Sequence, residues 1–181
     1  MLDLINVKKT FNPKTVNEKV ALAGVSLHLN DGDFVTVIGG NGAGKSTTLN
    51  AIAGVWPIDE GKIIIDGVDI THLSEHRRAG MLGRVFQDPM TGTAALDPRT
   101  AEKVLTLSRQ IIEENNLMNM MVTHNMRDAI AYGNRLIMMH EGRVILDISG
   151  EEKKKLTVEN LLEQFARVSG DEFVNDRALL S

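Results

Sequence analysis

The chain of 181 residues contains no cysteine, which excludes disulfide bridges, thiolate metal sites and cysteine nucleophiles. It lacks any apolar run near the ~18 residues that a membrane-spanning helix needs, and its start, MLDLINVKK, has no apolar secretory segment. Basic residues are not in excess, because 20 Lys and Arg stand against 24 Asp and Glu, a formal net charge of −4. We therefore expect a cytoplasmic protein whose partner is not nucleic acid.

The sequence does contain enough apolar side chain for a core, since 43% of its residues are hydrophobic. Runs of β-branched residues alternate with segments of helical spacing, which predicts an α/β fold with a partly parallel sheet. We expect one domain over residues 1–170 and a polar tail at 171–181. The predicted strands are Leu2–Val7, Phe34–Ile38, Lys62–Ile65, Arg84–Phe86, Met118–Val122, Leu136–Met139 and Val144–Ile148, and the predicted helices are Ser46–Ala53, Arg99–Glu114, Met126–Tyr132 and Val158–Val168.

Several other patterns have ordinary structural interpretations. The run EEKKK at 151–155 predicts a solvated face, and the helix at Val158–Val168 predicts packing against the body more than dimerisation. His72 and His76 are four residues apart but lack the glutamate of a metalloprotease helix, so zinc is not expected there. The methionines of the later strands are expected to pack within the sheet.

The segment that points most directly to a ligand is a glycine-rich loop between a strand and a helix. Residues Phe34–Ile38 run into the sequence GGNGAGKS at 39–46, and a helical pattern follows at once. Glycines let successive N–H groups turn towards a phosphate, and the helix N-terminus adds unpaired donors and a favourable dipole. In such a loop Lys45 reaches the β- and γ-phosphates and the Ser46 hydroxyl binds Mg²⁺. A purely structural glycine turn is the alternative, but it leaves the lysine and the hydroxyl unexplained.

The sequence around this loop, VALAGVSLHLNDGDFVTVIGGNGAGKSTTLNAIAGVWPIDEGKIIIDGVDIT, resembles the ATPase subunit of ATP-binding-cassette (ABC) transporters. The family's other landmarks follow in order. RVFQDP resembles the Q-loop with Gln87, ALDPRT resembles the D-loop with Asp97, and MMVTHNM resembles the switch strand with His124. Phe11 stands where the family has an aromatic residue that stacks on adenine. Each residue alone has a simpler interpretation, as a surface, turn, structural or core residue, but their order after the phosphate loop favours the site.

The resemblance implies a RecA-like P-loop fold with an ABC-type antiparallel strand group, and a set of functional residues. Its cofactors would be ATP and Mg²⁺, and its partners a second copy of the chain and membrane permease subunits on separate chains. The chain would lie at the cytoplasmic face of the membrane. The implied ATP-binding residues are Phe11, Gly39, Asn41, Gly42, Ala43, Gly44, Lys45, Ser46, Thr47, Gln87 and His124, with Ser46 and Gln87 on the metal and Lys45, Gln87 and His124 in catalysis.

The interval between Gln87 and His124 departs from the family. Only 36 residues separate them, and this interval holds neither an LSGGQ-like signature nor an apolar strand ending in Asp-Glu. The Walker B aspartate, which organises magnesium, and the glutamate that activates water are therefore absent. The nearest imitation, Val144–Asp147, comes after His124 and is interpreted as an ordinary late strand. The helical subdomain, the signature and the Walker B strand look excised in frame near Ala94 and Ala95.

Loss of the Walker B strand has a predictable effect on the sheet. In the family it lies between the Q-loop strand, here Arg84–Phe86, and the switch strand, here Met120–Val122. With neighbours ~4.8 Å apart, its removal leaves the outer two ~10 Å apart, too far for hydrogen bonds. We expect reduced stability, exposed strand edges and aggregation.

Two functional hypotheses follow. The chain is either an active transport ATPase whose cellular form contains the missing segment, or a catalytically silent nucleotide-binding protein or non-functional deletion product. An ABC-type ATPase of DNA repair or ribosome work is a third possibility, disfavoured by the acidic balance and the single cassette.

Overall fold

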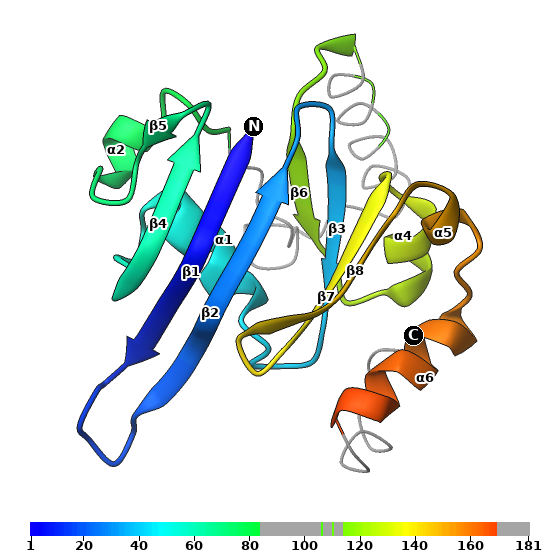
Figure 1. Cartoon of the computed structure of the whole chain (residues 1–181), viewed down its shortest axis with the longest axis horizontal. Helices are drawn as coiled ribbons and strands as arrows, with labels where there is room; N and C mark the ends of the chain where they lie inside the picture. Colours follow the sequence, from blue (N-terminus) through cyan, green and yellow to red (C-terminus); the bar gives the residue numbers. More distant parts are fainter. Residues whose placement is uncertain (84–105, 107–109, 111–113, 170–181) are drawn as a thin grey trace, which may run out of the picture.

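The computed structural model describes residues 1–83, 106, 110 and 114–169, which form two four-stranded sheets (Figure 1). The first sheet is antiparallel and has the order β2-β1-β4-β5. Its long strands β1 and β2 pair with each other, and the β4–β5 hairpin pairs with the other edge of β1. The strands are β1 (Leu2–Phe11), β2 (Lys19–Leu29), β4 (Glu60–Ile65) and β5 (Val68–Asp69).

The second sheet is partly parallel and has the order β6-β3-β7-β8. Strand β3 pairs in parallel with both β6 and β7, and β8 returns antiparallel to β7. The strand that leads into the glycine loop is thus flanked by two strands from much later in the chain. The strands are β3 (Phe34–Ile38), β6 (Asn119–Val122), β7 (Arg135–His140) and β8 (Arg143–Ser149).

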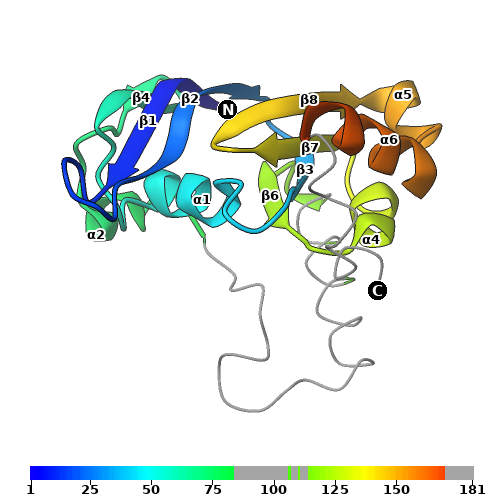
Figure 2. The same cartoon turned by 90° about the horizontal axis from the view of Figure 1, so that it is seen from below.

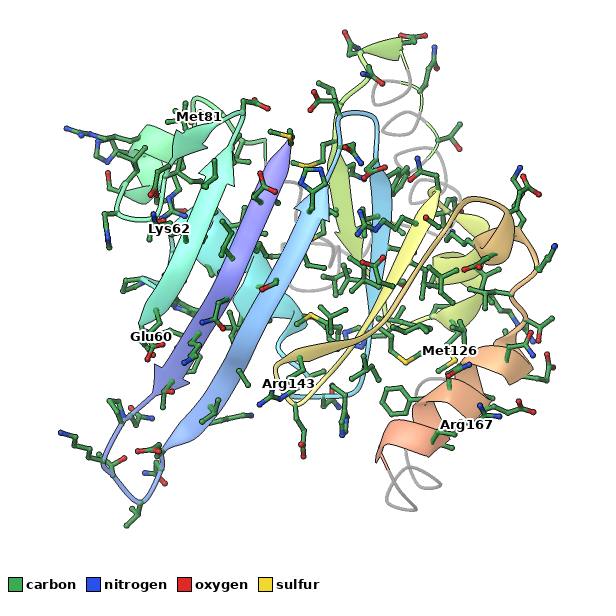
Figure 3. The ribbon with its side chains drawn as sticks, in the orientation of Figure 1. Glu60, Lys62, Met81, Met126, Arg143 and Arg167 are labelled. Carbon is green, nitrogen blue, oxygen red and sulfur yellow. The ribbon has the colours of Figure 1, made fainter. Side chains whose placement is uncertain are left out.

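Helices pack on both sheets. Figure 2 shows α1 running along one face of the antiparallel sheet, while α4 and α6 lie beside the second sheet. Met126, labelled in Figure 3, is the first residue of α4 and is buried in one cluster with Leu161 and Phe165 of α6. Within the described residues, no helix is both long enough and apolar enough to cross a membrane. The helices are α1 (Lys45–Ala53), α2 (Glu75–Arg78), α4 (Met126–Ala131), α5 (Gly150–Lys154) and α6 (Val158–Ser169).

The core has two parts, and β7 contributes to both of them. Ile137 and Met139 point into the larger cluster with the antiparallel sheet and α1. Leu136 and Met138 point the other way, into a cluster with α4 and α6. Successive side chains of a strand face opposite sides, so a strand buried on both faces is continuously apolar, as LIMM is here. The expected packing of these two methionines within the sheet is confirmed.

Every predicted strand and helix that lies wholly within the described residues is present, and the partly parallel α/β fold is confirmed. The helix after the loop ends at Gly54, which takes a left-handed conformation and donates to the carbonyls of Asn50 and Ala51. Strands β2 and β5 and the short helices α2 and α5 were not predicted. The predicted strand Arg84–Phe86 lies outside the described residues, as does most of the predicted helix Arg99–Glu114 and the tail at 171–181.

Strand β6 forms one edge of the second sheet as far as the structure describes it. Its pairing with β3 is regular, from Phe34 opposite Asn119 to Val37 opposite Val122. No described strand lies against its other edge, which is the side where the family has its Walker B strand. The predicted distance between this strand and the Q-loop strand involves residues that the structure does not describe.

The interpretation of the run EEKKK as a solvated face holds for four of its residues, which are exposed, and is wrong for Lys153. Lys153 is 3% exposed, and its Nζ donates to the carbonyls of Ile130 at 2.9 Å, Tyr132 at 2.5 Å and Gly133 at 3.0 Å. These carbonyls lie at the end of α4, where a cation is favoured. The expected packing of the last helix is confirmed, because Leu161 and Phe165 of α6 are buried in the smaller cluster.

Candidate nucleotide-binding site

The glycine loop runs from the end of β3 to the first residue of α1, as the sequence predicted. Gly39, Gly42 and Gly44 have φ values of 147°, 78° and 100°. A side chain at Gly39 would begin 2.2 Å from the carbonyl oxygen of Met139, and one at Gly44 would begin 2.7 Å from that of Ala21. Both the backbone conformation and the close neighbours therefore require glycine at these positions.

The turn between β7 and β8 holds this loop from outside. Glu141 and Gly142 both have positive φ, 46° and 72°, as a two-residue hairpin turn needs. The N–H of Gly142 donates to the carbonyl of Ala43 at 3.0 Å, and its carbonyl accepts from the N–H of Ala23 at 2.9 Å. The turn thus connects the phosphate loop to β2. The sequence analysis missed Gly142, although the pair Glu-Gly between two strands is a hairpin signal.

Lys45 is directed into the loop. Its side chain is buried, with 6% of the residue exposed, and its Nζ donates to the carbonyls of Gly39 at 2.6 Å and Gly40 at 2.8 Å. These carbonyls hold the ammonium group where a triphosphate would lie in a loop of this kind. Thr48, which was not predicted as a site residue, is buried and donates through Oγ1 to the carbonyl of Gly44 at 2.9 Å.

The first turn of α1 is suited to an anion. Its N-cap is Gly44, no side chain caps it, and no acidic residue lies in the first turn. The first N–H groups of a helix have no partner within the helix, and the helix dipole makes this end positive. Ser46 is exposed and Thr47 is half-buried beside these donors. Asn41 and Gly42, at the tip of the loop, are also exposed.

A second cation lies near this loop. A side chain at Gly42 would begin 3.3 Å from the Nζ of Lys19, the first residue of β2. Lys19 pairs across the antiparallel ladder with Phe11, the last residue of β1. Lys19 therefore links the predicted adenine-stacking residue to the phosphate loop. It was not predicted, because only the pairing of β1 with β2 brings it there.

Phe11 has aromatic and cationic neighbours. Its ring centroid lies 4.9 Å from that of Trp56, with the two rings at 82°, a T-shaped contact. The Nζ of Lys9 is 5.6 Å from the centroid of Phe11. The sequence analysis did not single out Trp56.

His124 lies at the same edge of the sheet as the glycine loop. Strands β6 and β3 are parallel, and the N–H of Thr123 still donates to the carbonyl of Val37 at 3.1 Å. His124 follows at once and is exposed. Asn125 then caps α4 by accepting from the N–H groups of Arg127 and Asp128. The structure therefore brings His124, Lys45 and the loop to one edge, the carboxyl edge where ligands bind in such sheets.

Some predicted site residues cannot be placed. Gln87 and Asp97 lie outside the described residues. Among residues 1–83 and 114–169, no group of three His, Asp or Glu side chains is arranged to hold a metal ion. Of the two predicted Mg²⁺ ligands, Ser46 and Gln87, only Ser46 lies within the described residues, and it offers its hydroxyl oxygen. Hydroxyl, carbonyl and phosphate oxygens suit this hard cation.

Strand, glycine loop and helix, together with an added antiparallel strand group, define a P-loop nucleotide-binding cassette. Residues 22–175 match the sequence profile of the ABC transporter family. The match covers most of the chain, so the chain belongs to this family. The predicted fold class, a RecA-like P-loop core with an ABC-type antiparallel group, is confirmed.

Three similar proteins illustrate the relationship. The tyrosine transport ATP-binding protein of Clostridioides difficile (strain R20291) is 30% identical over 247 residues, covering 91% of this chain and 98% of the relative. The energy-coupling factor transporter ATP-binding protein EcfA1 of Streptococcus pyogenes serotype M5 (strain Manfredo) is 29% identical over 192 residues, covering 91% and 68%. A dimeric, post-hydrolysis structure of the ATP-binding cassette MJ0796 with ADP and Pi has a TM-score of 0.67 at 21% identity, covering 82% and 98%.

The first of these alignments also bears on the missing segment. It extends over 247 residues, which is 66 more than the 181 residues of the whole chain. At least that many positions of the relative therefore have no counterpart here. These unmatched positions are consistent with a deleted segment, as is the absence of a signature and of an Asp-Glu pair between Gln87 and His124.

Proposed function

We propose that this chain binds Mg·ATP through its phosphate loop but hydrolyses it at a rate near background. The observation that carries the proposal is a contrast within one site. The loop around Lys45 is formed, with its glycines in the required conformations. The sequence between Gln87 and His124 lacks both the carboxylate that organises the metal and the one that activates water.

Each predicted residue has a role in the proposed complex. Lys45 exchanges its loop carbonyls for the β- and γ-phosphate oxygens, and backbone N–H groups of residues 39–47 donate to the phosphates. Ser46 and Gln87 bind Mg²⁺, His124 contacts the γ-phosphate, and Phe11 stacks on adenine.

The catalytic loss can be bounded by general magnitudes. A positioned general base contributes about 10²- to 10⁴-fold to a rate, and one preorganised donor to the transition state about 10²- to 10³-fold. The contributions do not simply multiply, because groups of one site act together. The chain lacks the base, the metal organiser and the signature donors at once. Binding depends on other residues, so it is weakened but retained.

The test is a pair of measurements on the purified chain and on Lys45→Ala. Calorimetric titration with millimolar Mg·ATP should give a binding heat for the wild type, and Lys45→Ala should lose it. For both proteins, the rate of phosphate release from ATP should equal the rate measured in buffer without protein. Steady hydrolysis that disappears in Lys45→Ala would refute the catalytic half of the proposal, and no Lys45-dependent heat would refute the binding half.

A second candidate function is an active transport ATPase, in which the gene encodes the missing segment. It is favoured by the alignment with the tyrosine transport ATP-binding protein, which covers 98% of that relative and 91% of this chain. Sequencing the gene across the codons of Ala94 and Ala95 distinguishes the two. An uninterrupted junction supports the catalytically silent protein or a non-functional deletion product, and extra codons support the transport ATPase.

In either case, we propose that the partners are a second copy of the chain and permease subunits on separate chains, at the cytoplasmic face of the membrane. The names of the relatives support this, because both are ATP-binding proteins of transport systems. Sedimentation with and without Mg·ATP tests self-association. Coupling to a permease is expected to be impaired, since the family's docking groove also needs the helical subdomain.

A further inference from the structure

The only tryptophan of the chain contacts the residue proposed to stack on adenine. Trp56 follows α1 and is half-buried. Its ring lies perpendicular to that of Phe11, with centroids 4.9 Å apart and an interplanar angle of 82°. Aromatic pairs favour this T-shaped arrangement, so the contact restricts how the Phe11 ring can turn.

The backbone of Trp56 is itself fixed to the end of α1. After Gly54 ends the helix, the N–H groups of Val55 and Trp56 donate to the carbonyl of Asn50 at 3.0 and 3.4 Å. The other end of this helix is Lys45 of the phosphate loop. Trp56 therefore connects the element that binds phosphate with the residue that faces the base.

The backbone near Phe11 is fixed independently. Asp59 accepts from the N–H of Thr10, and it also accepts from the Nζ of Lys9 at 3.0 Å. On the other side, Phe11 pairs with Lys19 of β2. The backbone position of Phe11 is thus set by β2 and Asp59, which leaves the orientation of its ring to Trp56 and Lys9.

We propose that Trp56 is a positioning residue for the nucleobase: it holds the Phe11 ring in the orientation on which adenine stacks. This rests on the proposed binding of ATP. An unrestrained ring must be ordered when the base binds, and a ring already held by its neighbour avoids that loss. An aromatic pair of this kind corresponds to about a 2- to 12-fold effect on affinity. The effect should be confined to ligands that carry a base.

The test compares Mg·ATP with Mg·tripolyphosphate, which has the phosphates but no base. Calorimetry gives the Kd of both ligands for the wild type, Trp56→Ala, Trp56→Phe, Phe11→Ala and the double variant. Trp56→Ala should weaken ATP binding about 2- to 12-fold and leave tripolyphosphate unchanged. Trp56→Phe, which keeps an aromatic ring, should retain most of the wild-type affinity for ATP. The double variant should bind ATP no more weakly than Phe11→Ala.

Fluorescence provides a readout that does not depend on Trp56→Ala folding. In the wild type, ATP should change the emission of Trp56 and tripolyphosphate should not, and in Phe11→Ala the response to ATP should be lost. Equal weakening of both ligands by Trp56→Ala, or an unchanged response in Phe11→Ala, would overturn the proposal while leaving ATP binding intact. A wild type that binds neither ligand would overturn the proposed function as well.

Discussion

Three buried cations, Lys45, Arg78 and Lys153, share one kind of environment. All three are at most 6% exposed, and each donates to backbone carbonyls. A buried charge is tolerated when its hydrogen bonds are satisfied, and loop and helix-end carbonyls provide acceptors without adding an acidic residue. For Lys45 we propose a functional consequence, namely that phosphate oxygens replace the same carbonyls when nucleotide binds. For Arg78 and Lys153 it is structural, since each holds the end of a helix.

Gly142 provides a test of how the phosphate loop is held. Gly142→Ala places a Cβ 2.7 Å from the carbonyl oxygen of Ala21, at a φ of 72°. We expect it to lose about 2–4 kcal/mol of unfolding free energy, from backbone strain and from the displaced turn. It should also weaken ATP binding, because the displaced turn moves the N–H of residue 142 away from the carbonyl of Ala43. Urea unfolding and calorimetric titration measure the two effects.

A matched control is available at the β4–β5 hairpin. Gly67 has a φ of 77°, and a Cβ there would meet nothing within 4 Å. Gly67→Ala should therefore show the strain alone, about 1 kcal/mol, with unchanged ATP binding. Equal losses in the two variants would show that the close approach of the turn to β2 is unimportant.

Helix α1 is held at both of its ends. At its start is the phosphate loop, and at its end the guanidinium of Arg78 donates to the carbonyls of Ala51 at 2.7 Å and Ile52 at 2.8 Å. The same guanidinium donates to the carbonyls of Thr71 and Leu73, both at 2.9 Å. Burial lowers the pKa of Arg78 from its ordinary value, yet arginine stays charged in proteins. One side chain thus joins the end of α1 to the segment before α2.

Removing this guanidinium should destabilise the whole fold. Arg78→Met keeps much of the apolar stem but leaves four carbonyls without their donor, and we expect a loss of about 2–4 kcal/mol. Arg77→Met is the matched control, because Arg77 is the adjacent residue of α2 and is exposed, so its loss should stay within about 0.5 kcal/mol. Urea unfolding compares the two. A similar small loss in both variants would contradict the role given to Arg78.

The features of the fold and the site that could be predicted from the sequence are those whose residues are close together in the chain. The phosphate loop was predicted because strand, glycines, lysine and helix are consecutive in the chain, and α1 ends at Ala53 as expected. Gly142 and Trp56 were missed because their contacts join segments that are far apart in the sequence, Gly142 with Ala43 and Trp56 with Phe11. The burial of Lys153 was not foreseen, because a charged run by itself indicates solvent exposure. The fold places the carbonyls at the end of α4 within hydrogen-bond distance of its Nζ. The conformation of the loop and of α1 can thus be read from consecutive residues. The contacts that hold the loop in place come from segments distant in the sequence, so the sequence did not reveal them.

The edge of strand β6 bears on the thermal stability and the association of the whole molecule. Within the part of the chain that the structure describes, one of its edges is unpaired by any strand. Such edges present backbone donors and acceptors that another chain can pair with. The larger core is otherwise continuous across both sheets. We therefore expect a folded protein with low thermal stability and a tendency to associate through this edge.

A charge on the edge strand tests the origin of association. Met121→Lys places a cation on β6, where its backbone partner is Thr36, and should reduce aggregation during heating. Met81→Lys is the control, because Met81 is 47% exposed but lies near α2, away from β6 (Figure 3). Light scattering during a thermal ramp, with sizing beforehand, measures the effect. A cooperative, high-melting monomer in the wild type would contradict the prediction.

The position of β3 between β6 and β7 has a consequence during synthesis. When residue 83 leaves the ribosome, the antiparallel sheet can form, but neither neighbour of β3 has yet emerged. At about 5–20 residues per second, the turn at Gly142 follows several seconds later. The nascent chain therefore exposes its glycine loop well before the strands and the turn that hold the loop, and we expect it to bind nucleotide only after Gly142 has emerged.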